Sequence, residues 1–371
     1  MTTKLLVAMQ NSLLIVESSN NNGWKKSRES LKGLSPQCVA FDPNSLNRAY
    51  YGTSGKGLYK TDDGGKTWDS CGKTTVQEKN EKGNNDNAAS RDSNNSITTA
   101  DIMSVSVSHL QGGRKNGFNT VYVGTEPTAL YKSDDGGESW ERMSALSNLR
   151  SSSIWCFPPR PWTSHVCWIE PDKTNADYIF VAIEAGALVQ SHDGGKTWVD
   201  KVDTGPYDTH TLATHKKIPK KLYSSAGDGY FESFDYGQSW KLPRKGLRHH
   251  YLAGLAVDSD DPNTVIISAS QSAWEGQYIE GAKSVLYRRT TASEEWSLVS
   301  NGLPEPNGTI ISILAANPKV AGEFYALNNR GIFCSTDLGI SWEKITDNKG
   351  IEWPKEYLSE HPRALAVQTG E

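Results

Sequence analysis

YKTDDGGKTW, residues 59–68, is the stretch that decides the fold, because it recurs along the chain with one fixed internal spacing. The shared pattern is Ser/Thr-x-Asp-x-Gly-x-Ser/Thr-Trp. Its other copies are YKSDDGGESW at 131–140, VQSHDGGKTW at 189–198, FESFDYGQSW at 231–240 and FCSTDLGISW at 333–342. A single Asp-Gly pair would predict an ordinary turn, whereas five copies with identical spacing indicate a repeat architecture.

The chemistry of the motif explains its spacing. Apolar residues before the Ser/Thr are typical of the end of a strand, and the Asp side chain can accept hydrogen bonds from backbone N–H groups that follow it. The Gly supplies the positive φ of a tight hairpin. The Trp then begins the next strand and offers a large apolar surface to bury. The motif therefore predicts a β-hairpin whose Asp is structural.

This motif resembles the Asp-box, or BNR, repeat of sialidase-like β-propellers, and the resemblance covers nearly the whole chain. It implies a hairpin and an architecture, but it does not imply an activity.

Two degenerate copies complete the set. Residues 4–24 end in a hairpin with Trp24 at the motif position, and residues 285–296 keep Trp296 without the Asp and Gly. An apolar strand that ends near an acidic residue or Asn, such as VAFDP at 39–43, precedes most copies, and a further strand, such as AYYGT at 49–53, follows it. With the two strands of the hairpin, each unit has four strands. The unit between Trp198 and Trp240 spans 42 residues, which fits one propeller blade. The sequence thus predicts an all-β fold, a single seven-bladed β-propeller domain over 1–371.

The first unit lacks its innermost strand, and the C-terminal segment PRALAVQ at 362–368 is a strand without a following hairpin. We therefore expect Ala364–Val367 to supply the innermost strand of the blade that begins at Leu5. Closure of this kind removes the edge strands that an open array would expose.

Three insertions lengthen the repeats. Residues 72–99 are polar and predict a mobile loop. Residues 143–163 contain two Trp, one Phe and three Pro, and predict an ordered lid or rim. A third insertion, 272–284, falls within the sixth unit.

The composition of the chain argues against nucleic acid and membranes as partners. The formal net charge of −4 and the isoelectric point near 6.1 give no general attraction to nucleic acid or to an anionic membrane. No apolar run approaches the roughly 20 residues of a membrane span. The five cysteines are an odd number without metal-site spacing, which favours reduced thiols and a cytoplasmic location. Composition leaves the oligomeric state open.

In propellers with this repeat, the connections between blades and the turns between second and third strands share one face, around the mouth of the central channel. We expect the functional site there. Alignment of the first strands predicts that His165 and His210 lie at the same level in adjacent blades, with Arg363 at that level in the closing blade. The predicted catalytic residues are His165, Glu184, His210 and Asp228. The predicted ligand-binding residues are Arg160, Trp162, His250, Glu275 and Arg363.

For each residue a structural role competes with the functional one. A histidine at a strand start can be a hydrogen-bonding rim residue, and Glu184 among apolar neighbours can belong to a salt bridge between blades. Asp228, in AGDGY, can simply cap a turn.

Three functions fit the face. The first is glycoside hydrolysis by paired carboxylates, Glu184 with Glu275 or Asp228. Sialidases resemble this chain in their motif copies, but they have six blades and an Arg-Ile-Pro motif that this sequence lacks, which argues against sialidase activity. Xyloglucanase-like enzymes join two seven-bladed propellers, and this chain has the length of one. The second is a metal-assisted enzyme, with a divalent or redox metal such as Zn, Fe or Cu on His165, His210 and His250, or with Glu184 as the third ligand. The third is a binding module, like the propellers related to photosystem assembly.

Our first expectation is a propeller that binds a small-molecule, carbohydrate or protein ligand at its channel mouth. The alternative is an enzyme on the same face, acting through carboxylates as a glycoside hydrolase or through a metal.

Overall fold

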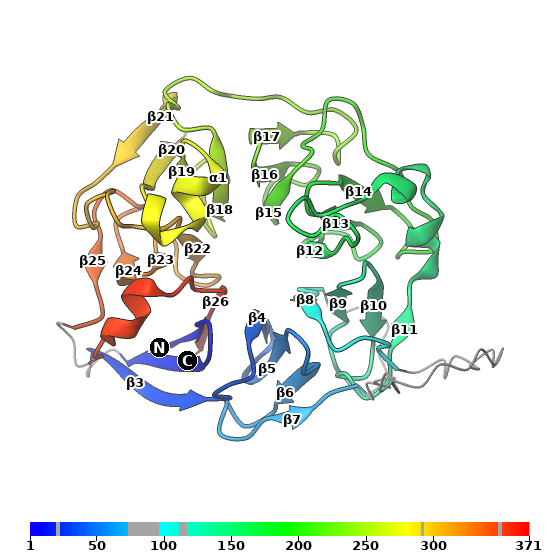
Figure 1. Ribbon diagram of the computed structural model, residues 1–371, viewed down its shortest axis with the longest axis horizontal. Coiled ribbons are helices and arrows are strands. Elements are labelled where there is room, and N and C mark those ends of the chain that lie inside the picture. The colour runs from blue at the N-terminus through cyan, green and yellow to red at the C-terminus, as the bar shows by residue number, and fades with distance from the viewer. Residues whose placement is uncertain (20–22, 73–95, 111–116, 291–292, 348–350, 371) are drawn as a thin grey trace.

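The computed structural model describes residues 1–19, 23–72, 96–110, 117–290, 293–347 and 351–370. Seven antiparallel sheets surround a central axis, and each is one blade (Figure 1). The chain is therefore a seven-bladed β-propeller, as the repeats predict.

Blades one to three have four strands each. From the axis outward, they consist of β26 (Ala364–Gly370), β1 (Thr2–Ala8), β2 (Leu13–Ser19) and β3 (Gly23–Ser30); β4 (Pro36–Asp42), β5 (Ser45–Thr53), β6 (Leu58–Thr61) and β7 (Asp69–Ser70); and β8 (Ile102–Val107), β9 (Val121–Thr125), β10 (Leu130–Ser133) and β11 (Glu141–Arg142).

Blades four and five have three strands each, and the outermost strand is reduced to the single bridges Gln190–Val199 and Glu232–Lys241. Their strands are β12 (Val166–Pro171), β13 (Ile179–Ile183) and β14 (Ala187–Ser191); and β15 (Thr209–Thr214), β16 (Leu222–Ala226) and β17 (Gly229–Ser233). Blades six and seven again have four: β18 (Tyr251–Val257), β19 (Val265–Ser270), β20 (Val285–Thr290) and β21 (Ser293–Val299); and β22 (Ile313–Ala316), β23 (Phe324–Asn328), β24 (Gly331–Ser335) and β25 (Glu343–Lys344).

The motif Asp is structural, as predicted. In the third blade Asp135 Oδ1 accepts hydrogen bonds from Ser133 Oγ at 2.8 Å and from the backbone N–H of Ser139 at 2.9 Å. Ser133 Oγ in turn accepts from the N–H of Gly137, which has φ 91°. The other four complete copies make the same set of bonds. These bonds are local in sequence, which is why one motif fixes the turn in every copy.

The core lies between neighbouring blades. Trp140, Trp240, Trp296 and Trp342 of the motif copies are buried, and each belongs to one of the apolar clusters of the ring. Because each blade buries its faces against both neighbours, no blade has a complete core of its own.

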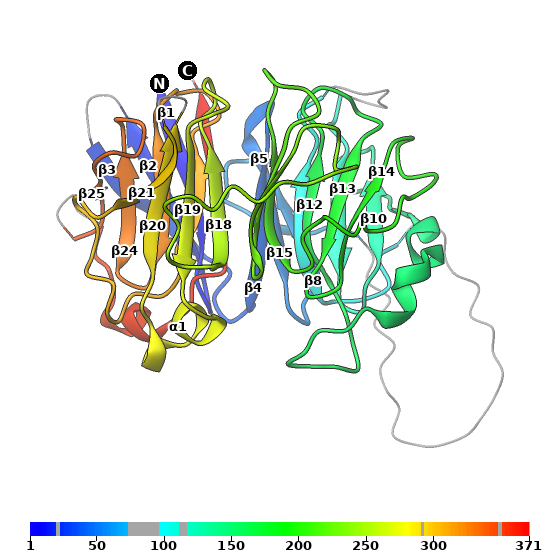
Figure 2. The ribbon, with the colours of Figure 1, turned by 90° about the horizontal axis from the view of Figure 1, so that it is seen from above.

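The ring closes as the sequence predicts. β26 pairs antiparallel with β1 over seven residues, with Leu5 opposite Val367 and Val7 opposite Leu365. The first and last segments of the chain thus share one blade, and both termini lie at the same end of the ring (Figure 2).

The other end of the ring carries helix α1 (Ala273–Gln277) and the 3-10 helix η3 (Ile279–Gly281), which belong to the insertion of the sixth blade (Figure 2). The insertion 143–163 contains the 3-10 helices η1 (Ser144–Asn148) and η2 (Arg150–Ile154), and a fourth, η4 (Lys355–Ser359), precedes the closing strand. Most of the predicted mobile loop, residues 73–95, lies outside the described residues. At its C-terminal end Ile97 is buried against the third blade. Among the residues that the structure describes, no helix is long and apolar enough to cross a membrane.

Candidate functional site

A cavity of about 670 Å³ occupies the centre of the ring and is lined by residues of all seven innermost strands. Each innermost strand begins at the end of the ring that carries α1. We call the opening of the channel at this end the channel mouth. Glu184, His210 and Arg363, three of the predicted site residues, line the cavity. Gln277 of α1 lies on the same lining.

His165 joins two carboxylates at the mouth. Its ring is 2% exposed, Nε2 lies 2.6 Å from Glu184 Oε2, and Nδ1 lies 3.5 Å from Glu126 Oε2 without a hydrogen bond. Arg160 donates to both oxygens of Glu126, from Nε at 3.0 Å and from Nη2 at 2.5 Å. The ring of Phe157 packs edge-on against His165, with centroids 4.9 Å apart. Arg160 therefore anchors Glu126, and Glu126 and Glu184 flank the buried imidazole.

Asp208 and His210 form a second pair in the next blade. His210 Nδ1 donates to the carbonyl of Leu252 at 2.6 Å, which leaves Nε2 facing Asp208 Oδ2 at 3.5 Å. The N–H of Ala185, next to Glu184, donates to Asp208 Oδ1 at 2.9 Å. This bond ties the second pair to the turn that carries Glu184.

Burial opposes the charge on both members of this pair, but the contact between them outweighs burial. The contact with Asp208 raises the pKa of His210 above its usual value, and the contact with His210 lowers the pKa of Asp208 below its usual value. The ion pair is therefore strongest in the pH window between the lowered pKa of Asp208 and the raised pKa of His210. Within that window Asp208 is ionised and His210 carries a proton.

The prediction that His165 and His210 occupy the same level is wrong. The pairing of β12 with β13 shifts between Val166 and Trp168, and that of β15 with β16 shifts between Thr209 and Thr211. His210 is thus the extra residue of a β-bulge and corresponds to Cys167, whereas His165 precedes its strand and corresponds to Asp208. His210 therefore lines the cavity as Cys167 does, whereas His165, two residues earlier along its blade, is buried and hydrogen-bonded to Glu184.

The remaining predicted residues spread over the same face. Asp228 accepts backbone hydrogen bonds from Tyr207 at 3.2 Å and Asp208 at 3.4 Å, so it holds the turn that positions Asp208. His250 is exposed at the start of β18. Glu275 lies on α1, and its buried Oε2 has no hydrogen-bond partner. Trp162 is 79% exposed. Arg363 directly precedes β26.

The three predicted metal ligands do not form a cluster. His165 Nε2 and His210 Nδ1 are already engaged with Glu184 and with the carbonyl of Leu252. Across the described part of the chain, no group of three or more His, Cys, Asp or Glu side chains could hold a metal ion. The metal interpretation gains no support from this arrangement.

Sequence reasoning left several residues of the mouth out of the predicted site. Glu126 and Asp208 contact the two histidines of the mouth, but neither is among the predicted site residues. The signal for Glu126 was available, because Glu126 and Glu184 each follow the second strand of their blades. Tyr251, which packs against His210 and accepts a hydrogen bond from Gln277 at 3.1 Å, had no such signal.

Exposed aromatic rings lie in connections that precede innermost strands and in the insertion of blade six. Trp162 lies in the connection before β12 and Tyr207 in the connection before β15, whereas Trp274 and Tyr278 belong to the insertion of blade six. The rings of Trp274 and Tyr278 are stacked, with centroids 4.9 Å apart and an interplanar angle of 22°. The mouth therefore combines carboxylates with flat apolar surfaces, an arrangement that suits a ligand with both hydroxyl groups and apolar faces.

No known protein-family profile matches the chain. The xyloglucanase Xgh74A of Acetivibrio thermocellus is 24% identical over 212 residues, which are 49% of this chain and 24% of that protein. The chain thus spans about a quarter of the length of this curated relative.

Two solved structures share the fold. An ancestral GH74 enzyme superposes with a TM-score of 0.60 at 17% identity, over 84% of this chain and 38% of the other. The structure of YCF48 bound to D1 peptide superposes with a TM-score of 0.52 at 18% identity, over 83% of this chain and 81% of the other. At these identities the likeness concerns architecture: the chain is a seven-bladed β-propeller that resembles the propellers of GH74 xyloglucanase structures.

Proposed function

We propose that the channel mouth is a carbohydrate-binding site that carries the carboxylates of a glycoside hydrolase. The observation that carries this proposal is the pair Glu184 and Asp208 from two adjacent blades: Glu184 lines the cavity, and the backbone N–H of Ala185, next to it, donates to Asp208. Glycoside hydrolases use two carboxyl groups, one to protonate the leaving oxygen and one to activate water or attack the sugar.

The surroundings of the two carboxylates suggest a role for each. Asp208 is ionised in the window given above, so it serves as the base or nucleophile. Glu184 lines the cavity, and it is hydrogen-bonded to a buried imidazole that Glu126 also contacts. In this proposal Glu184 gives its proton to the glycosidic oxygen as the bond between that oxygen and the sugar breaks. A water molecule then gives its hydroxyl to the new reducing end and its remaining proton to the carboxylate that acts as the base.

The exposed aromatic rings add binding surface. They come from three separate connections on one face, which matches an extended polymer better than a single sugar. The relatives at 24% identity include a xyloglucanase, and this supports a β-glucan as the substrate class. The match covers 24% of that protein, so xyloglucan hydrolysis by this chain is a proposal.

Binding can be measured by the retardation of the protein in gels that contain xyloglucan or another soluble β-glucan. We expect Trp162→Ala and Trp274→Ala each to weaken binding by about fivefold or more, because loss of a stacking partner costs on the order of 1 kcal/mol. Phe234→Ala is the control, since Phe234 is exposed on a motif hairpin at the opposite end of the ring. Equal retardation of all three variants would contradict the proposed surface.

A second candidate function is the binding of an extended peptide at the same mouth without catalysis. The observation that favours it is the match to the YCF48 structure with bound D1 peptide, of which this chain covers 81%, against 38% of the ancestral GH74 structure. Retention on a peptide column without retardation by any glucan would favour this candidate.

A further inference from the structure

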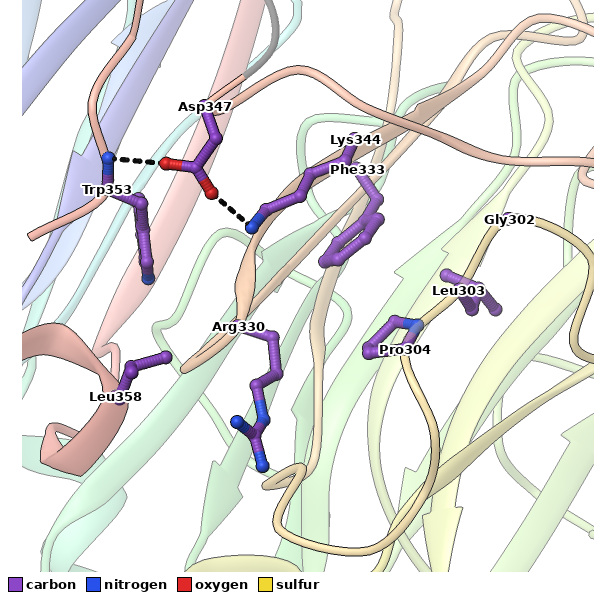
Figure 3. Close-up of a pocket in the computed structure, with 9 residues that line it drawn as sticks. All are labelled: Gly302, Leu303, Pro304, Arg330, Phe333, Lys344, Asp347, Trp353 and Leu358. Atoms are coloured by element: carbon purple, nitrogen blue, oxygen red, sulfur yellow. Dashed lines mark hydrogen bonds and ion pairs between the residues drawn. The ribbon is translucent and has the colours of Figure 1, made fainter. Parts of the chain in front are cut away.

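A second pocket lies away from the channel, on the outer part of blade seven (Figure 3). Its volume is about 500 Å³, and none of its lining residues lines the central cavity. The lining comes from the connection between blades six and seven, from β24 and β25, and from the segment around η4. Its members are Gly302, Leu303, Pro304, Arg330, Phe333, Lys344, Asp347, Trp353 and Leu358.

Among the charged residues of the lining, Lys344 is paired with Asp347, whereas Arg330 can bind a ligand. Lys344 Nζ donates to Asp347 Oδ2 at 2.5 Å, and the backbone N–H of Trp353 donates to Asp347 Oδ1 at 3.0 Å, so these two charges neutralise each other. The guanidinium of Arg330 lies 3.5 Å from the carbonyl of Asn307, and among the described residues no carboxylate lies within ion-pair distance of it. In Figure 3 the guanidinium extends into the space between Leu358 and Pro304. A planar guanidinium in this position suits a carboxylate, which it can bind through two parallel hydrogen bonds.

The walls around Arg330 are apolar. Phe333 and Trp353 are buried with one face toward the pocket, and the exposed Leu358 and half-buried Leu303 and Pro304 form its sides. A ligand that places a carboxylate on Arg330 would therefore bury an apolar group against these walls.

The adjoining strand edge favours a peptide over a small organic acid. β25 is the outermost strand of blade seven, so that one of its edges is not paired with another strand of the sheet. Lys344 of β25 lines the pocket, which places this edge beside the binding space. An extended peptide can add to such an edge while its end enters a pocket. We propose that the pocket binds the free C-terminal carboxylate of a peptide whose last side chain is apolar, with Arg330 holding the carboxylate.

The probe is a fluorescein-labelled tetrapeptide, Gly-Gly-Ala-Leu, with either a free carboxylate or a C-terminal amide, and the readout is fluorescence anisotropy. We expect the amide to bind the wild-type chain at least tenfold more weakly than the free acid, and Arg330→Gln to weaken binding of the free acid by a similar factor. Arg142→Gln is the matched control, because Arg142 is exposed on blade three and should leave binding unchanged.

Other outcomes would overturn the proposal. These are no saturable binding of the free acid, equal binding of acid and amide, or unchanged binding by Arg330→Gln. Hexanoate that competes at the same concentration as the peptide would reassign the pocket to small carboxylates. Tighter binding of a peptide that ends in Asp would contradict the role of the apolar walls.

Discussion

Deletion of residues 362–371 is expected to lower the melting temperature by at least about 5 °C. The deletion removes β26, which pairs with β1 over seven residues, and leaves blade one without its innermost strand. It also uncovers Leu5, Val7 and Met9, which are fully buried in the cluster between blades one and seven. Burial of such side chains contributes about 1.5–3 kcal/mol each, and in a domain of this size each kcal/mol lost shifts the melting temperature by roughly 1–1.5 °C.

Thermal unfolding followed by circular dichroism measures this effect. Addition of a synthetic peptide with the sequence of 362–371 should restore part of the loss, whereas a scrambled peptide should not. A truncated protein that melts at the wild-type temperature would show that closure of the ring contributes little to stability.

Replacement of Glu232 by Ala is expected to destabilise the fold by about 3–5 kcal/mol, because it leaves two buried cations without a counter-charge. Glu232 lies between blades five and six, where it accepts from Tyr230 at 2.8 Å, pairs with Arg289 and lies 3.8 Å from Lys221. The side chains of Glu232, Arg289 and Lys221 are 9%, 10% and 4% exposed. Burial lowers the pKa of Lys221, although Glu232 opposes that shift.

Urea unfolding of Glu232→Ala beside Asp260→Ala provides the comparison. Asp260 pairs with Lys217 at the surface, where water screens the charges, so its loss should leave stability nearly unchanged. If the two variants unfolded at the same urea concentration, the buried ionic network between blades five and six would not contribute to the free energy of unfolding as we expect.

The architecture was predictable from the sequence because its determinants are local. In each complete motif copy the Ser/Thr, Asp and Gly contact one another within a few residues, so the motif specifies its own turn. The first unit had one strand too few and the C-terminal segment one strand too many, so the two had to join in one blade to close the ring. The pairing of Leu5 with Val367 confirms this closure.

The arrangement of the site was less predictable because it depends on strand register. The alignment that matched His165 with His210 was displaced by two residues, because the pairing of β12 and β15 with their neighbouring strands makes Cys167 equivalent to His210 and His165 equivalent to Asp208. Pairs such as Glu126 with Arg160 form between segments that are 34 residues apart, and no local pattern specifies them. Sequence thus placed Glu184, His210 and Arg363 near one another, as the cavity lining shows, whereas the contacts between Glu126, His165 and Glu184 required coordinates.

Release of reducing ends from soluble β-glucans, by the wild-type chain and by Glu184→Gln, tests the proposed function most directly. Our account predicts steady release by the wild-type chain and a rate about 10²–10⁴-fold lower for Glu184→Gln, since the amide cannot donate the proton. Binding in the glucan gels should persist in that variant, because the aromatic surface is intact. Retardation of the wild-type chain by a glucan without any release of reducing ends would contradict catalysis and leave the mouth as a binding site.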